Sequence, residues 1–357
     1  MQQGGAICIE LRYMHYCSLS SAIVGADLEL IGTTLEGELL MKLQRFALAL
    51  AGIGLLGASV SSVPAFAGKT DPKPYTSDKV AHPTPVKALA AGGPCISYVG
   101  VPTAAGTMQE IDATPGAHPT AVSWEPFNYV PTRTNATWYG AVNAAGTQFY
   151  YYGLMLQGAN LYRQTTYLPD EKPPVPTFKK VGTGWSSFTS IATSNYSVAT
   201  PRHAYLYGLN TNGSLYRYQM VGTSFRGLGP IPGFRGFKAM TVLSETATYD
   251  TLLMTTTAGA LWSVRIPTAV STKPILKRIR SGGWQNFESL VVENCGSRGG
   301  LLILGVDNNT QTGTLYAMSK ANGAATALTG YGPIQGVVFN GVDTVREASY
   351  YDQLVGE

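Results

Sequence analysis

The chain has 357 residues, a formal net charge of +4 and only 13% charged residues. Its 41 Gly, 21 Pro and 21 Tyr are typical of turns and strands rather than of helices, so the composition favours an all-β protein. The basic residues are scattered singly or in pairs, as in Lys179-Lys180 and Lys277-Arg278. This spacing argues against a nucleic-acid-binding protein, whose basic residues form a continuous stripe.

Residues 41–67, MKLQRFALALAGIGLLGASVSSVPAFA, have the pattern of a secretory signal peptide. Lys42 and Arg45 precede an apolar stretch, and Ala65-Phe66-Ala67 is a small-x-small cleavage site. A membrane anchor is the alternative, but the apolar stretch is short for a membrane span. We therefore expect no membrane span after cleavage and a location outside the cell or at its envelope. Residues 1–40, which precede this segment, show no clear periodicity. We interpret them as a mis-assigned translation start or an unstructured segment.

Residues 68–93 are rich in Pro, Thr, Lys and Ala and predict a disordered tether, followed by one domain over residues 94–357. The exported part keeps two cysteines, Cys95 and Cys295. An exported protein can join such a pair in a disulfide, but the sequence leaves disulfide and free thiols equally open.

Two sequence marks recur in the domain. The first is an aromatic residue, usually after Gly and followed by a second aromatic residue. Its copies are SWEPF at Trp124, GWSSF at Trp185, GFRGF at Phe234, GGWQNF at Trp284 and a weaker GYGPIQGVVF at Tyr331.

The second mark is a pair of apolar and aromatic runs around a Gly-containing turn, which predicts a β-hairpin. Its copies span residues 97–110, 151–163, 205–217, 252–263 and 302–317. Five copies of each mark at a spacing of about 50 residues predict a five-bladed β-propeller. The first hairpin lacks its aromatic partner and the last aromatic mark lacks its hairpin, so we expect N- and C-terminal half-blades to pair and close the ring. A β-sandwich with coincidental turns is the alternative fold.

The segments 181–188 with 208–217, and 279–287 with 313–316, resemble the tachylectin family of five-bladed propeller lectins. The resemblance extends loosely over residues 93–354. It implies shallow sites for N-acetylated amino sugars, one in each blade, around the Gly-Trp turn. The family's polar Asp-Asn-Trp segment is missing here, and Phe234 and Tyr331 stand in place of Trp.

This resemblance makes the Gly-Trp turns the candidate ligand-binding residues: Gly184, Trp185, Gly283, Trp284 and, in the first copy, Trp124. The alternative role for each Trp is packing between blades, which tolerates any large ring and so suits the Phe and Tyr replacements. We expect no cofactor, because no His or Cys has a partner at metal-ligand spacing. Asp307-Asn308-Asn309 resembles part of a calcium loop, but a polar hairpin turn is the stronger interpretation.

Together these patterns predict a secreted, non-catalytic, lectin-like propeller that binds glycans or cell-wall polysaccharide. The first alternative is a protein-interaction or envelope-scaffold propeller without sugar binding. The second is a propeller glycoside hydrolase, since catalytic carboxylates need not be close in sequence. Its candidate carboxylates are Asp170, Glu171, Glu245, Asp250 and Glu288.

Overall fold

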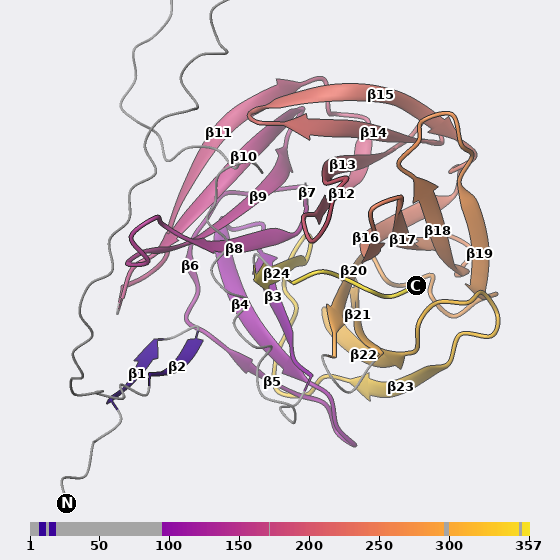
Figure 1. Cartoon of the computed structure of the whole chain (residues 1–357). Coiled ribbons are helices and arrows are strands. Elements are labelled where there is room, and N and C mark those ends of the chain that lie inside the picture. Colours follow the sequence, from indigo (N-terminus) through magenta and orange to yellow (C-terminus); the bar gives the residue numbers. More distant parts are fainter. Residues whose placement is uncertain (1–6, 12–13, 19–94, 171, 296–299, 350–351) are drawn as a thin grey trace, which may run out of the picture. The chain divides into compact units, whose positions relative to one another are not determined.

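The computed structural model describes residues 7–11, 14–18, 95–170, 172–295, 300–349 and 352–357 (Figure 1). The chain divides into two compact units, residues 1–72 and residues 73–357. The described part of the first unit is one antiparallel strand pair, β1 (Ile7–Leu11) with β2 (Met14–Ser18). The signal peptide and the tether lie outside the described residues, so they stay predictions, as does the interpretation of residues 1–40.

The described part of the second unit is built from strands, which confirms the all-β prediction. It contains three four-stranded sheets, each an antiparallel meander in chain order, the arrangement of a propeller blade. The first is β12 (Phe188–Tyr196), β13 (His203–Asn210), β14 (Ser214–Val221) and β15 (Ser224–Pro232). The second is β16 (Phe237–Glu245), β17 (Tyr249–Thr256), β18 (Leu261–Pro267) and β19 (Ile275–Arg280). The third is β20 (Ser289–Asn294), β21 (Leu301–Asp307), β22 (Thr312–Met318) and β23 (Leu328–Pro333).

The remaining ten strands form one larger sheet in the order β11-β10-β9-β8-β24-β3-β4-β5, with β6 on β4 and β7 on β9. Strand β24 joins its two halves, because it pairs antiparallel with β3 and parallel with β8. One half is β3 (Ser97–Pro102), β4 (Thr107–Thr114), β5 (Thr120–Ser123) and β6 (Phe127–Asn128). The other is β7 (Thr134–Asn135), β8 (Trp138–Val142), β9 (Phe149–Gln157), β10 (Asn160–Leu168) and β11 (Val175–Thr183), and β24 itself is Val345–Ser349.

All five predicted hairpins are confirmed, as β3-β4, β9-β10, β13-β14, β17-β18 and β21-β22. The Asp307 turn of the last hairpin is held locally, since Asp307 Oδ1 accepts the backbone N–H groups of Asn309 and Thr310 at 2.9 and 3.1 Å. These hydrogen bonds are those of a polar hairpin turn.

Burial falls from the first strand of each sheet to the last. Seven consecutive residues of β16 are buried, whereas four of the six residues of β19 are exposed. The first strands contact one another in succession, β7 with β12, β12 with β16, β16 with β20, and β20 with β24. Figure 1 shows them near the centre of the unit, with β11, β15, β19 and β23 outside. Apolar clusters fill the spaces between neighbouring sheets; one of them contains Leu154 and Leu206, and another contains Val99 and Val291.

One backbone hydrogen bond recurs five times and shows which residues of the repeats are equivalent. In each copy a large apolar residue donates its N–H to a backbone carbonyl near the start of the second strand of the preceding hairpin. The pairs are Tyr129 to Gly106, Trp185 to Ala159, Phe234 to Gly213, Trp284 to Gly259 and Ile334 to Gly313, at 2.8 to 3.0 Å. The first and last aromatic marks were therefore aligned wrongly in the sequence, because Tyr129 and Ile334, rather than Trp124 and Tyr331, take the position of Trp185.

The two cysteines of the described domain form a disulfide. Cys95 and Cys295 are bonded across 200 residues of sequence, with their Cα atoms 4.9 Å apart. The bond connects the segment before β3 to the segment after β20, two elements that also contact each other.

We expect Gly153→Ala to destabilise the protein by about 1 to 3 kcal/mol, because there is no room for a methyl group. A Cβ at Gly153 lies 2.3 Å from Trp138 Cδ1 and 2.9 Å from Trp138 Nε1. The matched control is Gly227→Ala in β15, where the nearest side-chain atoms are 3.9 Å away. Urea unfolding of both variants checks this, and equal midpoints would contradict the packing of Trp138 on β9.

We expect reduction of the Cys95–Cys295 bond to lower the unfolding free energy by about 2 to 5 kcal/mol, since the bond closes a long loop in the unfolded chain. The measurement is the melting temperature with and without dithiothreitol. The control is the Cys95→Ser/Cys295→Ser double variant, whose melting temperature must not respond to the reductant.

Candidate functional site

The structure places the rings of Trp185 and Trp284 in the core. Their relative exposures are 6% and 4%. Trp185 contacts the rings of Phe188 and Tyr218 at centroid distances of 4.4 and 5.2 Å. Trp284 contacts Phe287 and Tyr316 at 5.3 and 4.7 Å. Neighbouring rings thus occupy the space that a sugar ring needs for stacking, and the observed role of both Trp side chains is packing.

The other predicted site residues are more accessible than these two Trp side chains. Trp124 is half-buried, and its indole Nε1 donates to Asp112 Oδ2 at 3.2 Å. Gly184 and Gly283 have φ values of +81° and +93°, are exposed, and have open space at the Cβ position. The backbone at these two glycines is therefore accessible, and a ligand contact there stays a prediction.

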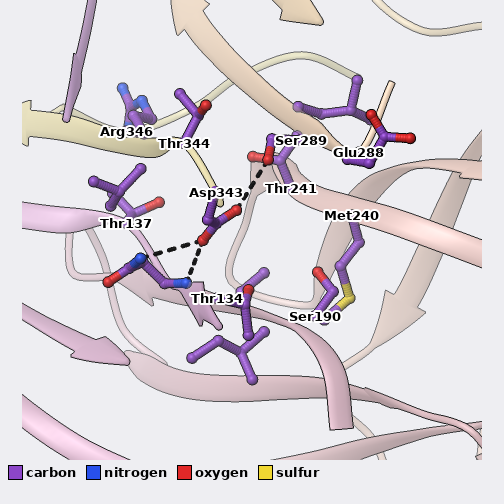
Figure 2. Close-up of a pocket in the computed structure, with 15 residues that line it drawn as sticks. Thr134, Thr137, Ser190, Met240, Thr241, Glu288, Ser289, Asp343, Thr344 and Arg346 are labelled. Atoms are coloured by element: carbon purple, nitrogen blue, oxygen red, sulfur yellow. Dashed lines mark hydrogen bonds between the residues drawn. The ribbon is translucent and has the colours of Figure 1, made fainter. Parts of the chain in front are cut away.

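A different set of side chains converges on a pocket at the centre of the unit (Figure 2). Two adjoining cavities share the lining residues Thr134, Ser190, Glu288, Ser289 and Asp343. We call the two together the central pocket; the outer cavity has a volume of about 220 Å³. Its walls come from the beginnings of the mutually contacting strands β7, β12, β16 and β20 and from the segment before β24.

In three of the repeats, the residue that follows the second aromatic residue contributes to the pocket rim. These residues are Thr189 after Phe188, Lys238 after Phe237 and Glu288 after Phe287. Arg133 and Asp343 complete the rim from the starts of β7 and β24. The repeat alignment contains this position, but its residue type varies between repeats, so the sequence alone does not identify it as part of a site.

An ion pair and a short hydrogen-bond chain organise one side of the pocket. Lys238 Nζ lies 3.0 Å from Glu288 Oε1, and both side chains are partly exposed. Glu288 Oε2 accepts the backbone N–H of Asn308 at 3.0 Å. Asn308 Nδ2 donates to the Val342 carbonyl at 3.2 Å, while its buried Oδ1 has no partner. A buried acceptor beside a polar cavity is a group that a ligand or water can satisfy.

Asp343 joins three elements in the pocket wall. Its Oδ1 accepts from Ser289 Oγ at 3.0 Å, and its Oδ2 accepts from the backbone N–H and, at 3.2 Å, the Nδ2 of Asn135 (dashed lines in Figure 2). Desolvation by burial raises the pKa of Asp343 to about 6, although the hydrogen bonds from Asn135, Thr344 and Ser289 oppose this shift. Both oxygens already accept hydrogen bonds, so the carboxylate holds the pocket wall together as well as adding charge.

The central pocket thus offers hydroxyl, amide, carboxylate and ammonium groups within a small volume. This set can hydrogen-bond a small ligand that carries several polar groups. Within the described residues, no group of three or more His, Cys, Asp or Glu side chains is arranged to hold a metal ion. Among the same residues, no helix is long and apolar enough to cross a membrane.

A second polar cluster is buried at the far ends of the same first strands. Arg346 donates to Glu293 Oε2 from Nε and Nη2 at 3.0 and 2.8 Å and also pairs with Asp352. Glu245 accepts hydrogen bonds from Asn195 N at 2.6 Å and from Gln353 Nε2 at 3.0 Å. Burial raises the pKa of Glu245 to about 7, with Asp250 adding to the shift, and raises that of Glu293 to about 8 despite Arg346.

The comparisons with known proteins give no family. No family profile matches the chain, and no curated protein matches it. Among solved structures, the catalytic domain of a GH62 α-L-arabinofuranosidase from Coprinopsis cinerea is 12% identical with a TM-score of 0.39, covering 61% of this chain and 81% of that one. The fucose-specific lectin from Aleuria aurantia is 11% identical with a TM-score of 0.37, covering 72% and 85%. The SapL1 lectin in complex with α-methyl fucoside is 11% identical with a TM-score of 0.35, covering 67% and 80%.

Likenesses at this level assign neither a fold nor a function to the chain. The resemblance to tachylectins stays a prediction from the sequence.

We expect the melting temperature to fall as the pH rises from 5 to 9. The protonated forms of Glu245 and Glu293 favour the folded state, because their folded pKa values exceed the ordinary value of 4.5. This contribution is complete below pH 4.5 and is lost as the pH rises through about 7 for Glu245 and about 8 for Glu293.

The variant Glu245→Gln should flatten this slope, because its side chain does not titrate. The control is Asp307→Asn, since hydrogen bonds from Thr310 and Asn309 overcome burial and lower the pKa of Asp307. Its slope between pH 5 and 9 should match that of the unchanged protein. If the melting temperature of Glu245→Gln changes with pH as steeply as that of the unchanged protein and of Asp307→Asn, Glu245 does not titrate in this range.

Proposed function

We propose that residues 95–357 form a five-bladed β-propeller whose fifth blade combines β24 with β3, β4 and β5. The three four-stranded meanders supply three blades, and the larger sheet divides at β24 into two more. The fivefold recurrence of the backbone hydrogen bond at Tyr129, Trp185, Phe234, Trp284 and Ile334 supports this number. The pairing of β24 with β3 supports closure of the ring by the two ends of the domain.

We further propose that this propeller is a secreted or envelope-associated, non-catalytic, glycan-binding protein and that the central pocket is its ligand site. The observation that carries this proposal is the convergence of five different polar side chains on one rim: Arg133, Thr189, Lys238, Glu288 and Asp343. Sugars are recognised through several directional hydrogen bonds at once, and this rim provides both donors and acceptors. The signal-peptide pattern of residues 41–67 supports export.

The resemblance to tachylectins makes N-acetylated amino sugars, free or within cell-wall glycans, the first class to test. The pocket volume of about 220 Å³ suits a single sugar unit, such as the end of a glycan chain. This proposal has one central site, whereas the resemblance implies a site at the Gly-Trp turn of each blade; sites at those turns stay a prediction.

The second candidate function is a protein-interaction or envelope scaffold without sugar binding. The burial of Trp185 and Trp284 favours it, because the two rings expected to stack on sugars serve packing instead. The two functions separate on a glycan array and a cell-wall pull-down: absence of binding in both would leave the scaffold as the better proposal. Turnover of a bound glycan would make the protein a hydrolase and overturn the non-catalytic assignment.

If the central pocket is the site, we expect Lys238→Met and Asn308→Ala each to weaken glycan binding about tenfold, because each removes a polar group from the rim. Isothermal titration with the best ligand from the array measures this. The control Val198→Thr changes an exposed loop residue outside the pocket and should bind as the unchanged protein does. Loss of binding in Trp284→Phe alone, with Lys238→Met unaffected, would instead place the site at the Gly-Trp turn.

A further inference from the structure

The charged groups around the central pocket are sorted by sign. The contacts between first strands give the order β7, β12, β16, β20 and β24 around the pocket. In that order the rim residues are Arg133, Thr189, Lys238, Glu288 and Asp343. One half of the rim therefore carries two cations around a hydroxyl, and the other half carries two neighbouring carboxylates.

The cationic half is fixed by the turn that precedes β12. The Arg133 guanidinium donates to the backbone carbonyls of Ser186 at 3.0 Å, of Trp185 at 3.3 Å and of Phe188. These acceptors are neutral, so the positive charge of Arg133 remains available to a ligand at the rim. Lys238 donates to the Gln285 carbonyl and to Glu288, and it marks the boundary between the two halves.

Two buried acceptors next to the carboxylates lack hydrogen-bond partners. Asn308 Oδ1 and Asn135 Oδ1 are buried without a hydrogen bond, and both residues line the pocket. Each is next to a carboxylate, since Asn308 N bonds to Glu288 and Asn135 bonds to Asp343. A ligand group that enters the anionic half must bring donors, and an ammonium group brings three together with a positive charge.

We propose that the sugar unit bound in the central pocket carries both an amino group and a carboxylate. The ammonium lies against Glu288, Asp343 and the free oxygen of Asn308, and the carboxylate lies against Lys238, Arg133 and the Thr189 hydroxyl. A ligand with a single charge meets a like charge on one half of the rim, whereas a zwitterion is complementary to both halves. This inference rests on the proposed glycan-binding function and names a different sugar class for the same site, because the amide of an N-acetylated amino sugar carries no positive charge.

Four monosaccharides of similar size test the charge pattern at pH 7 and low salt. Muramic acid carries an amino group and a carboxylate, glucosamine only the amino group, glucuronic acid only the carboxylate, and N-acetylglucosamine neither charge. We expect the full chain to bind muramic acid about tenfold more tightly than N-acetylglucosamine in isothermal titration, with the other two between them. This preference should shrink in 0.5 M NaCl, because salt screens charge pairs at a partly exposed rim.

Tighter or equal binding of N-acetylglucosamine overturns the charge inference and leaves the glycan-binding proposal standing. Binding of none of the four overturns the glycan-binding proposal, and the charge inference with it. These two results are distinguishable in a single set of titrations.

The double variant Lys238→Glu/Glu288→Lys provides the matched control, because it keeps the ion pair and reverses its direction across the rim. We expect its preference for muramic acid over N-acetylglucosamine to fall below twofold, and this ratio, rather than either affinity alone, tests the inference. If this variant does not fold, Lys238→Gln/Glu288→Gln removes both charges at nearly constant size and should lose the preference in the same way. A preference that persists in the folded variant shows that the sorted charges do not select the ligand.

Discussion

Strand β24 is the constraint on which both polar centres depend. It is held on both edges, antiparallel to β3 and parallel to β8, so its position along its neighbours is set by two ladders of hydrogen bonds. Asp343, two residues before β24, consequently reaches Asn135 and Ser289 in the central pocket. Within it, Arg346 reaches Glu293 at the other buried cluster. A shift of one residue would exchange the two faces of β24 and separate all of these partners.

Two positions in each repeat have different roles, one in packing and one at the pocket. The residue that donates the recurring backbone hydrogen bond needs only bulk and apolarity, which explains why Tyr129, Trp185, Phe234, Trp284 and Ile334 all serve. The position after the second aromatic residue lies at the rim of a cavity, so packing does not restrict its type. Thr189, Lys238 and Glu288 therefore differ in charge at the same position of the repeat, and the pocket that they line is asymmetric although the sequence is repetitive.

The structural features that could be predicted from the sequence are those that depend on residues close together in the chain. A hairpin is set by apolar residues and a tight turn within a dozen positions, so all five were found. Four of the turns contain a glycine at positive φ, and the fifth has Gln311 at positive φ. The sequence alignment matched Trp124 with Trp185 because both are Trp residues followed by Phe. The residue that makes the same backbone hydrogen bond as Trp185 is Tyr129. The central pocket was missed because its residues are about 50 positions apart and differ in type; Glu288 appeared only among unranked carboxylates.

The amino-acid sequence alone determined the all-β class, the hairpins and the number of repeats, because strand alternation and turn chemistry act over short distances. Only the tertiary structure decided that the Trp rings are covered, that Cys95 and Cys295 are joined, and that five unlike side chains meet at one rim. Burial and convergence depend on which sheets lie next to each other. That neighbourhood is set by contacts between segments far apart in the chain, which no local pattern records.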